Sequence, residues 1–573
     1  MEVTEGGYAG GRDEHAEVSP ADRHATGCFP TRAGHTHVGR TVYGRAVSDL
    51  EAVVEGYCNR SSYEPGEQLV LHCGATLPRP SGRVASATEP LAFSVEVARL
   101  GQHREIVHRI DGLVAENHPI PDEAAGHGAD WPSTTSFATD PAWRSGWYEI
   151  RLTTTRPDGS TIERTAGFVL RAATGKPSAR ILFPLALNTW NAYNDWGRSN
   201  LYTGGTHVSF RRPFAKGFLD RPDAGAHRLA NSTDEPDLNG DIWTAYYRTN
   251  AISSWSGCAG WPTWEGPFAV WAERNGYELD YAVNADLEER PEILDAYPMM
   301  LSVGHDEYWS SPMRDTVEAF IRRGGNVAFL SGNTSFWQVR LEDGGTTMVS
   351  YKDTARRQDP LRHSHPELLT GMWSDPIIGR PESRMTGVSF SRGGYARQAG
   401  CTPRGQRGYT VWQPEHWLFE GTDLRYGDLL GATQCVVGYE CDGCEMTTLN
   451  GLPAPTHTDG TPESFAILGS APARLYHVDI EAGINEYPTG LQAMRTVGEL
   501  VGVAHVLFGS ASPENIQRVA HGNAVLGSYV APSGGTVVTS GCTDWAYGLA
   551  GNDPLVEQVT RNVLDRLSGA PNP

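Results

Sequence analysis

Residues 298–333 read PMMLSVGHDEYWSSPMRDTVEAFIRRGGNVAFLSGN and decide the fold class. The apolar runs PMMLSVG (298–304) and NVAFLSGN (326–333) have the length of strands. Continuous apolar runs of this kind suit strands that are buried on both faces of a parallel sheet. A helical pattern separates the two runs. Because strand, helix and strand alternate, this stretch predicts a doubly wound α/β domain.

The helix between the two runs has signals at both ends. Ser310 or Ser311 can cap it, Pro312 suits its first turn, and Gly324-Gly325 end it. Its apolar face consists of residues at helical spacing, namely Met313, Val317, Phe320 and Ile321. The sequence therefore predicts an amphipathic helix here.

Similar patterns extend over residues 175–573. ILFPLAL (181–187) has the composition of another buried strand. PFAVWAERN (267–275) predicts a helix, as does VEQVTRNVLDRLSG (556–569) near the end of the chain. Residues from about 380 to 545 are richer in strand patterns. We therefore expect an amidotransferase-like α/β domain with a β-rich C-terminal part.

Residues 51–174 show a different pattern. Apolar and polar residues alternate in short segments such as LAFSVEVARL (91–100) and SGWYEIRLTT (145–154), and Pro/Gly turns separate the segments. Since no helical pattern intervenes, this region predicts an all-β module, a β-sandwich. Residues 1–50 are rich in Gly, His and charge without a clear period, and we expect them to form a loosely ordered arm.

The composition excludes several classes of function. The formal net charge is −21, without the basic stripe that nucleic-acid-binding proteins carry. No apolar run approaches the roughly 18–20 residues of a membrane span, and the N-terminus lacks the features of a secretory signal. Nine widely spaced cysteines do not resemble a disulfide framework. We therefore expect a cytoplasmic protein that binds neither nucleic acid nor membrane.

Three polar motifs follow three predicted strands. NTWNAYNDWG (188–197) follows the first strand, HDEYWS (305–310) follows the second, and Asn333 closes the third. In open α/β sheets, ligands bind beyond the carboxyl ends of the strands. If the strands are parallel and close together, the three motifs converge at one edge of the sheet.

The H-x-E pair within HDEYWS suggests a metal site. His305 and Glu307 lie two residues apart, so on an extended backbone both side chains point to one face. They can then bind one ion, although ordinary hydrogen bonds are the structural alternative. Asp306 is expected to point toward the N-terminus of the following helix. A third ligand must come from elsewhere, and a tyrosinate oxygen would favour a hard ion such as ferric iron.

Several segments together resemble a known family. NTWNAYNDWGRSNLY (188–202), residues 304–333, VVGYECDG (436–443) and VVTSGCTDWAYGL (537–549) are similar to the C-terminal domain of the N,N-dimethylformamidase large (beta) subunit. The resemblance covers most of residues 175–573 in order. It implies a mononuclear iron enzyme, with zinc less favoured, that hydrolyses an N-substituted formamide or a related small amide. It also implies an oligomer and a separate small subunit.

The resemblance implies which residues hold the metal. The H-x-E pair of the family matches His305 and Glu307. Tyr193 lies in the first motif and is chosen as the tyrosine ligand, with Tyr246 and Tyr247 as rivals.

The resemblance also implies which residues act on the substrate. Asn333 matches a polar residue that orients the amide and helps to stabilise the oxyanion. Glu440 matches a carboxylate beside the metal. It would take a proton from the attacking water and pass it to the leaving amine, while the metal activates the water and polarises the amide oxygen.

The sequence leaves three alternatives. Cys441 and Cys444 have a spacing that suits zinc, but no second pair accompanies them. Ser331 could act as a nucleophile, but neither a nucleophile-elbow motif nor a nearby His supports it. A non-catalytic carbohydrate- or protein-binding scaffold on the same fold would contain no metal and would tolerate changes in the H-x-E pair.

Overall fold

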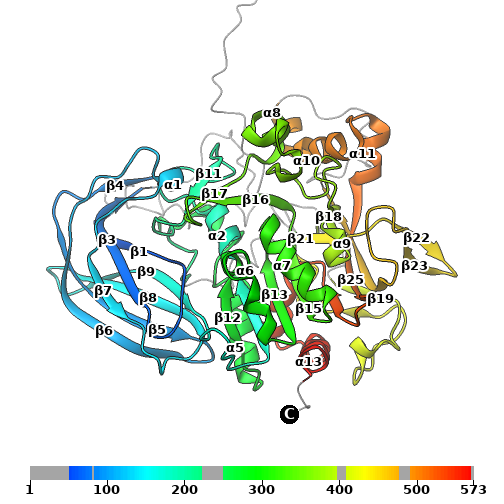
Figure 1. Ribbon diagram of the computed structural model, residues 1–573, viewed down its shortest axis with the longest axis horizontal. Helices are drawn as coiled ribbons and strands as arrows, with labels where there is room; N and C mark the ends of the chain where they lie inside the picture. The colour runs from blue at the N-terminus through cyan, green and yellow to red at the C-terminus, as the bar shows by residue number, and fades with distance from the viewer. Residues whose placement is uncertain (1–50, 80–82, 222–249, 397–407, 476–490, 570–573) are drawn as a thin grey trace, which may run out of the picture.

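The computed structural model describes residues 51–79, 83–221, 250–396, 408–475 and 491–569. All-β sheets form the N-terminal part, and a mixed sheet with helices forms the rest (Figure 1). This arrangement confirms the expectation of an α/β part combined with an all-β part. The domain limits at residues 50 and 174 and the likeness to amidotransferases stay predictions.

Two sheets form the N-terminal part. One has the order β1-β3-β4 with β7 paired to β3, and the other has the order β2-β9-β8-β5-β6. Their strands are β1 (Val53–Cys58), β2 (Ser62–Tyr63), β3 (Gln68–Pro78), β4 (Val84–Ser86), β5 (Leu91–Leu100), β6 (Arg104–Ala115), β7 (Thr135–Ala138), β8 (Gly146–Thr155) and β9 (Thr161–Leu170). Leu71 of the first sheet and Val95, Ile150 and Phe168 of the second belong to one buried cluster. The alternating pattern thus gives both sheets an apolar face within a shared core.

An 11-stranded sheet forms the centre of the molecule. Five neighbouring strands run parallel in the order β12-β10-β13-β15-β26. They are β10 (Ile181–Leu185), β12 (Asp280–Val283), β13 (Met299–His305), β15 (Asn326–Gly332) and β26 (Thr536–Thr539). The apolar runs at 181–187, 298–304 and 326–333 therefore do form neighbouring parallel strands.

Antiparallel strands continue this sheet from β26 through β25, β24 and β18 to β21. The strands of this C-terminal part are β18 (Ser389–Tyr395), β19 (Tyr409–Val411), β20 (Leu429–Leu430), β21 (Glu440–Gly443), β24 (Ala466–Arg474) and β25 (His521–Val530), with a hairpin of β22 (Met446–Leu449) and β23 (Leu452–Pro455). The part is β-rich, as expected. It also contains α9 (Ser383–Thr386), α10 (Leu491–Phe508) and α11 (Pro513–Ala520), which the sequence patterns did not predict.

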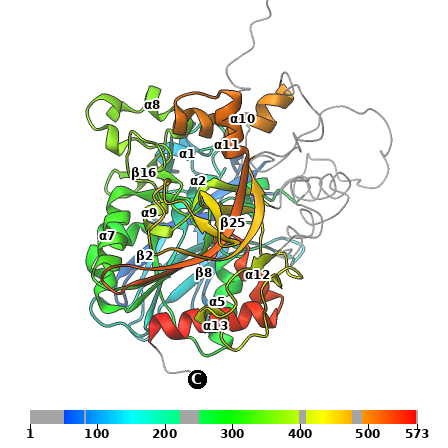
Figure 2. The same cartoon turned by 90° about the vertical axis from the view of Figure 1, so that its right-hand side faces the viewer.

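Helices cover both faces of the parallel strands. The helices α6 (Asn284–Glu289) and α7 (Ser311–Arg322) share one core cluster with the sheet, while α5 (Glu265–Arg274), α12 (Trp545–Ala550) and α13 (Pro554–Ser568) share another. The side view places α7 and α12 on opposite sides (Figure 2). Coverage of both faces explains why most residues of the parallel strands are apolar.

The predicted amphipathic helix is α7. Ser310 is its N-cap and its side chain accepts a hydrogen bond from the Met313 amide at 3.3 Å. Met313, Val317, Phe320 and Ile321 are all buried, as the helical spacing predicted.

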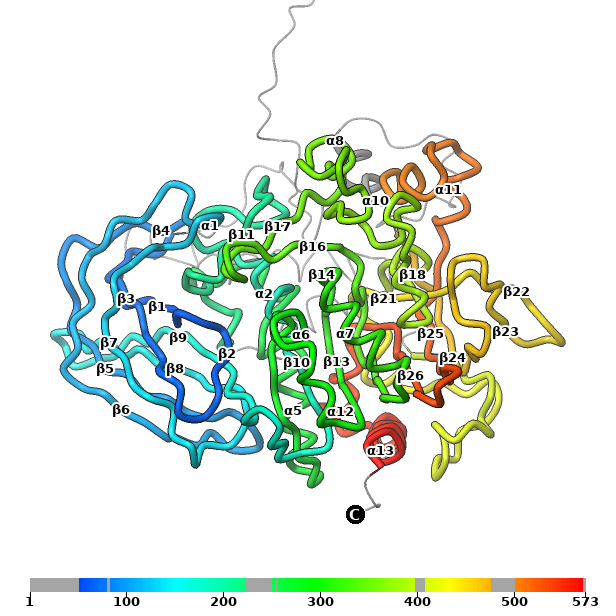
Figure 3. Tube along the Cα trace, viewed as in Figure 1, coloured from blue at the N-terminus to red at the C-terminus, as the bar shows by residue number. Residues whose placement is uncertain are grey.

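A smaller sheet lies next to the carboxyl ends of the parallel strands (Figure 3). Its order is β11-β17-β16-β14. Its strands are β11 (His207–Ser209), β14 (Tyr308–Ser310), β16 (Trp337–Glu342) and β17 (Thr347–Val349). β14 begins three residues after β13 ends, and β16 begins five residues after β15 ends, so short connections join this sheet to the central strands.

Among the described residues, no helix is long and apolar enough to cross a membrane. Six of the seven described cysteines are free and buried, and Cys258 is disulfide-bonded.

Candidate active site

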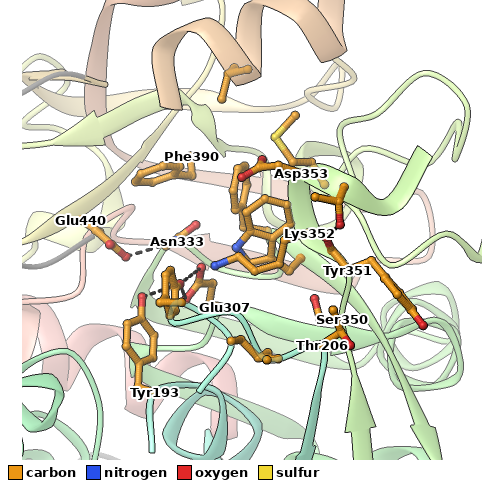
Figure 4. Close-up of a pocket in the computed structure, with 18 of the residues that line it drawn as sticks. Tyr193, Thr206, Glu307, Asn333, Ser350, Tyr351, Lys352, Asp353, Phe390 and Glu440 are labelled. Atoms are coloured by element: carbon orange, nitrogen blue, oxygen red, sulfur yellow. Dashed lines mark hydrogen bonds between the residues drawn. The ribbon is translucent and has the colours of Figure 1, made fainter. Parts of the chain in front are cut away.

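The polar motifs converge where the parallel strands end. Tyr193 is the last residue of α2 (Leu187–Tyr193), which follows β10, and His305 is the last residue of β13. Asn333 directly follows β15, and Glu440 begins β21. Figure 4 shows Tyr193, Glu307, Asn333 and Glu440 around one cavity. The structure thus brings the expected residues together, whereas their chemical roles stay predictions.

The side chains of the H-x-E pair point to the same side. His305 Nε2 lies 3.3 Å from Glu307 Oε2, and both side chains are buried. Thr189 Oγ1 accepts a hydrogen bond from the Glu307 amide at 2.9 Å, which fixes the backbone at this point.

Asp306 does not lie at the N-terminus of the following helix, contrary to the expectation. Its carboxylate accepts hydrogen bonds from Asn284 Nδ2 at 2.9 Å, Ser302 Oγ at 2.8 Å and Trp309 Nε1 at 2.9 Å. The physical reason is that Ser310 already caps the helix, so the buried carboxylate serves to join neighbouring elements instead.

His305 lies between two carboxylates. Its Nδ1 is 2.7 Å from the carbonyl oxygen of Cys258, and its Nε2 is 2.7 Å from Glu440 Oε2. Burial would lower the pKa of His305, but Glu440 and Glu307 outweigh it and raise that pKa well above its usual value. For Glu307, burial acts in the opposite direction and would raise the pKa. The hydrogen bond from His305 nevertheless holds the pKa of Glu307 below its usual value.

Tyrosine hydroxyls surround the Glu307 carboxylate. The hydroxyl of Tyr202 lies 2.7 Å from that of Tyr193, and 2.9 and 3.1 Å from the two oxygens of Glu307. Tyr308 donates a hydrogen bond to the Tyr202 hydroxyl at 2.8 Å. Burial raises the pKa of all three phenols well above 10.

Tyr202 is a site residue that the sequence interpretation missed. It is the last residue of the motif at 188–202, nine residues after Tyr193, so its position in the motif was the available signal. The rival ligands Tyr246 and Tyr247 lie outside the described residues.

Asn333 is held by alternate residues of one strand. Its Nδ2 donates a hydrogen bond to Glu440 Oε2 at 2.9 Å and lies 3.4 Å from His305 Nε2. The Asp442 carboxylate accepts from the amides of Asn333 at 2.9 Å and Thr334 at 3.0 Å. These bonds fix Asn333 in a left-handed conformation with a φ of 51°, which Asn tolerates better than most residues.

Asp442 was not predicted to belong to the site. Burial raises the pKa of this carboxyl to about 8. Its sequence position, two residues after Glu440 on a strand, places both side chains on one face of β21.

The cavity encloses about 170 Å³. Tyr193, Tyr202, Glu307, Asn333 and Glu440 of the cluster described above line it. Aromatic side chains line it as well, namely Phe336, Trp337, Phe390, Tyr395 and Tyr439. Lys352 also lines the cavity, and its Nζ lies 3.1 Å from the centroid of the Tyr202 ring and 4.9 Å from that of Trp337. The positive charge of Lys352 contributes to the lowered pKa of Glu307. No motif in the sequence indicated this lysine.

The donors at the floor suit a hard metal ion in combination with a tyrosine. Among the residues described by the structure, no group of three or more His, Cys, Asp and Glu side chains could hold a metal ion. An ion here would therefore depend on phenol oxygens in addition to Glu307 and His305. The Cys258 carbonyl accepts from Nδ1 and leaves Nε2 directed at the carboxylates, an arrangement typical of metal-binding histidines.

The cysteine and serine alternatives find no support in the geometry. Cys441 and Cys444 are buried free thiols, and burial raises the pKa of both. Ser331 Oγ makes hydrogen bonds with Ser302 and Thr334, so within the described part of the chain it serves the local packing of strand ends.

Buried titratable groups with shifted pKa values, placed at the strand ends of an α/β sheet, are typical of enzyme active sites. The chain belongs to the family described as N,N-dimethylformamidase beta subunit-like, C-terminal, whose model matches residues 94–559. The expectation drawn from the sequence motifs is thereby confirmed.

Two named relatives are distant. The N,N-dimethylformamidase beta subunits of Alcaligenes sp and Paracoccus aminophilus are 25% and 24% identical over 229 residues. The match covers 36% of this chain and about a quarter, 27%, of the length of each relative.

Two solved structures are similar to parts of this chain at low TM-scores, and neither indicates its function. The sporulation control protein Spo0M from Bacillus subtilis is 9% identical over 21% of this chain and 50% of its own, with a TM-score of 0.15. Chitinase ChiW from Paenibacillus sp. is 11% identical over 51% of this chain and 28% of its own, with a TM-score of 0.14.

Proposed function

We propose that the chain is a metal-dependent amidohydrolase that cleaves the C–N bond of an N-substituted formamide or a related small linear amide. The products are formate, or another acid, and an amine. The observation that carries the proposal is that two phenol oxygens, the Glu307 carboxylate and the Glu440 carboxylate line one cavity, with His305 Nε2 within 3.3 Å of both carboxylates. Membership of the family supports the reaction class.

Ferric iron is the metal that this donor set favours, because phenolate and carboxylate oxygens are hard ligands. Tyr193, His305 and Glu307 are the proposed ligands, and Tyr202 is placed to contribute a further oxygen. When bound, such an ion supplies Lewis acidity that polarises the amide oxygen and acidifies water.

The protein's own groups then move the proton and hold the substrate. Glu440 accepts a proton from the attacking water and returns it to the leaving amine nitrogen. Asn333 Nδ2 keeps the Glu440 carboxylate in place, and the Asn333 amide aligns the substrate. The aromatic walls exclude bulk water from the reacting groups.

The geometry of His305 supports a second role. With Nδ1 bonded to the Cys258 carbonyl, Nε2 can either offer a lone pair to a metal or carry a proton for Glu440 at 2.7 Å. Nε2 cannot bind a metal and carry a proton at the same time. His305 is therefore either a ligand or the group that delivers a proton through Glu440.

Iron analysis combined with a panel of formamides tests the proposal. The purified protein should contain near-stoichiometric iron, with a visible tyrosinate charge-transfer band, and should release formate and amine. Glu307→Ala should lose both iron and activity. If His305→Ala also loses iron, the residue is a ligand; if it keeps iron but loses activity, the residue carries the proton.

The chain contains a matched control for this experiment. His365 and Glu367 form a second H-x-E pair that is exposed, with His365 Nδ1 3.3 Å from Glu367 Oε1. His365→Ala and Glu367→Ala should change neither iron content nor turnover. Tyr193→Phe and Tyr202→Phe, compared by the same absorption band, distinguish the two phenols as ligands.

A non-catalytic scaffold that binds carbohydrate or protein is the alternative. A colourless protein without iron that tolerates His305→Ala and Glu307→Ala would favour it.

Because the named relatives are beta subunits, we also propose that this chain assembles with copies of itself and with a small partner subunit. A native mass larger than that of one chain would agree with the assembly. The cytoplasmic location stays a prediction.

A further inference from the structure

We infer that one N-substituent of the amide substrate carries a hydroxyl group, and that Ser350 binds this hydroxyl. The inference rests on the proposed function and defines its substrate class more closely. The carrying observation is that Ser350 lines the cavity and has a buried hydroxyl without a hydrogen-bond partner among the described residues. The whole residue is only 1% exposed. The second substituent on nitrogen is left open, so dialkyl formamides remain within the class.

Polar residues line the cavity from two sides. Figure 4 shows Tyr193 and Glu440 on one side, and Ser350 beside Thr206 on the other. The first side holds the groups that we propose for the reaction. Because the acyl carbon of a formamide carries only hydrogen, a substrate group that reaches the second side must be attached to the nitrogen.

The position of Ser350 is fixed by the small sheet. Ser350 directly follows β17, which pairs antiparallel with β11, so that His207 is opposite Val349. The Ser350 amide donates a hydrogen bond to the carbonyl oxygen of Thr206 at 2.9 Å. The hydroxyl of Thr206 is already engaged with His207 Nδ1 at 2.9 Å. Backbone pairing thus holds Ser350 at the cavity, while its side chain is left for a ligand.

An unpaired buried hydroxyl is unfavourable, and a ligand that pairs with it removes the penalty. A serine hydroxyl can donate one hydrogen bond and accept others, so a ligand hydroxyl can bond to it in either direction. An alkyl group of the same size would leave Ser350 unpaired. The rings of Tyr202 and Trp337 also line the cavity and suit the carbon chain that carries the ligand hydroxyl. The expected substrates are therefore formamides with a terminally hydroxylated alkyl substituent.

A series of matched substrates tests the inference without any mutation. N-methyl-N-(hydroxyalkyl)formamides of increasing chain length are each paired with the N-methyl-N-alkylformamide in which a methyl group replaces the hydroxyl. The ratio of kcat/KM within each pair is measured for the iron-loaded enzyme. We expect this ratio to be about 2- to 13-fold higher at one chain length than at the others, because only one length places the oxygen at Ser350. A ratio that does not vary with chain length would overturn the inference.

The variant Ser350→Ala removes only the hydroxyl oxygen. At the preferred chain length, its ratio should fall by about 2- to 13-fold relative to the wild type. The intrinsic reactivities of the two substrates cancel, because the same pair is used with both proteins. An unchanged ratio in Ser350→Ala would contradict the inference, since the hydroxyl would then serve water or no ligand.

The chain contains a matched control for this variant. The hydroxyl of Ser335 is also buried without a partner among the described residues, but Ser335 does not line the cavity. Ser335→Ala should therefore keep the wild-type ratio at every chain length. An equal fall of the ratio in both variants would show that the effect does not come from a contact between Ser350 and the substrate.

Binding measurements separate this inference from the proposed function. If no member of the series is hydrolysed, the proposed function is wrong, and calorimetric titration of the same pairs still measures the preference. Weaker binding of the hydroxyalkyl compound to Ser350→Ala than to the wild type, without a matching change for the alkyl compound, would support the hydroxyl site. Equal binding to both proteins would overturn it.

Discussion

At the scale of single residues, the site depends on side chains that hold other site residues in place. Asn333 is expected to contact the substrate, but its conformation is fixed by Asp442, whose carboxylate accepts two backbone hydrogen bonds at 2.9 and 3.0 Å. Asp442 is thus a positioning residue, and its effect on turnover should be separable from any effect on metal binding.

We therefore predict that Asp442→Asn lowers kcat by about tenfold to a hundredfold, because small displacements of aligned groups have effects of this size. An amide at position 442 can accept from only one of the two backbone donors with its single oxygen, so Asn333 would shift. Iron content, measured on the same samples, should stay at the wild-type level, and KM should change less than kcat. Loss of iron together with activity would instead indicate collapse of the whole site.

At the scale of elements, the N-terminus of α7 connects the metal motif to the packing of the sheet. Ser310 caps the helix three residues after Glu307, and its hydroxyl also donates to Glu288 Oε2 at 2.5 Å. Its removal leaves the Met313 amide and the half-buried Glu288 carboxylate without this partner.

Ser310→Ala should lower the free energy of unfolding by about 1 kcal/mol, the usual value for loss of an N-cap. Ser311→Ala is the matched control, because among the described residues its hydroxyl accepts only from Arg380 Nη1, at a long 3.4 Å. Urea denaturation of both variants measures the difference. If both variants lose the same amount of stability, loss of the N-cap is not the cause.

At the scale of the whole molecule, buried carboxyl groups make stability depend on pH. Burial raises the pKa of Glu265 to about 8, while Trp190 Nε1 donates to its Oε1 at 2.9 Å. Its Oε2 has no hydrogen-bond partner among the described residues, which agrees with a protonated acid. Such a group stays neutral when folded but ionises in the unfolded chain.

The direction of this pH dependence follows from proton binding. Between the usual pKa of about 4.5 and the folded value of about 8, the folded state binds more protons than the unfolded state. The contribution of Glu265 is fully present below pH 4.5 and is lost as pH rises toward 8, by about 1.4 kcal/mol per pH unit at most. Glu265→Gln should therefore gain stability relative to the wild type between pH 5.5 and 8 in guanidinium denaturation. Parallel pH profiles for the two proteins would contradict this.

The sequence by itself determined the strands and the helix around the H-x-E motif, and the family. Continuous apolar runs identified β10, β13 and β15 because strands covered on both faces need apolar residues throughout. Cap and periodicity signals located α7, since these are local properties of the chain. The i, i+2 spacing placed His305 and Glu307 on one side for the same reason.

Only the tertiary structure decided which distant groups complete the site. Tyr202 bonds to Glu307 and Lys352 lies over the Tyr202 ring, while Asp442 bonds to Asn333 across more than a hundred residues. Such contacts depend on how strands are ordered in the sheet, which no local pattern encodes. The position of Asn333 beside Glu440 likewise follows from hydrogen bonds between residues that are far apart in the sequence.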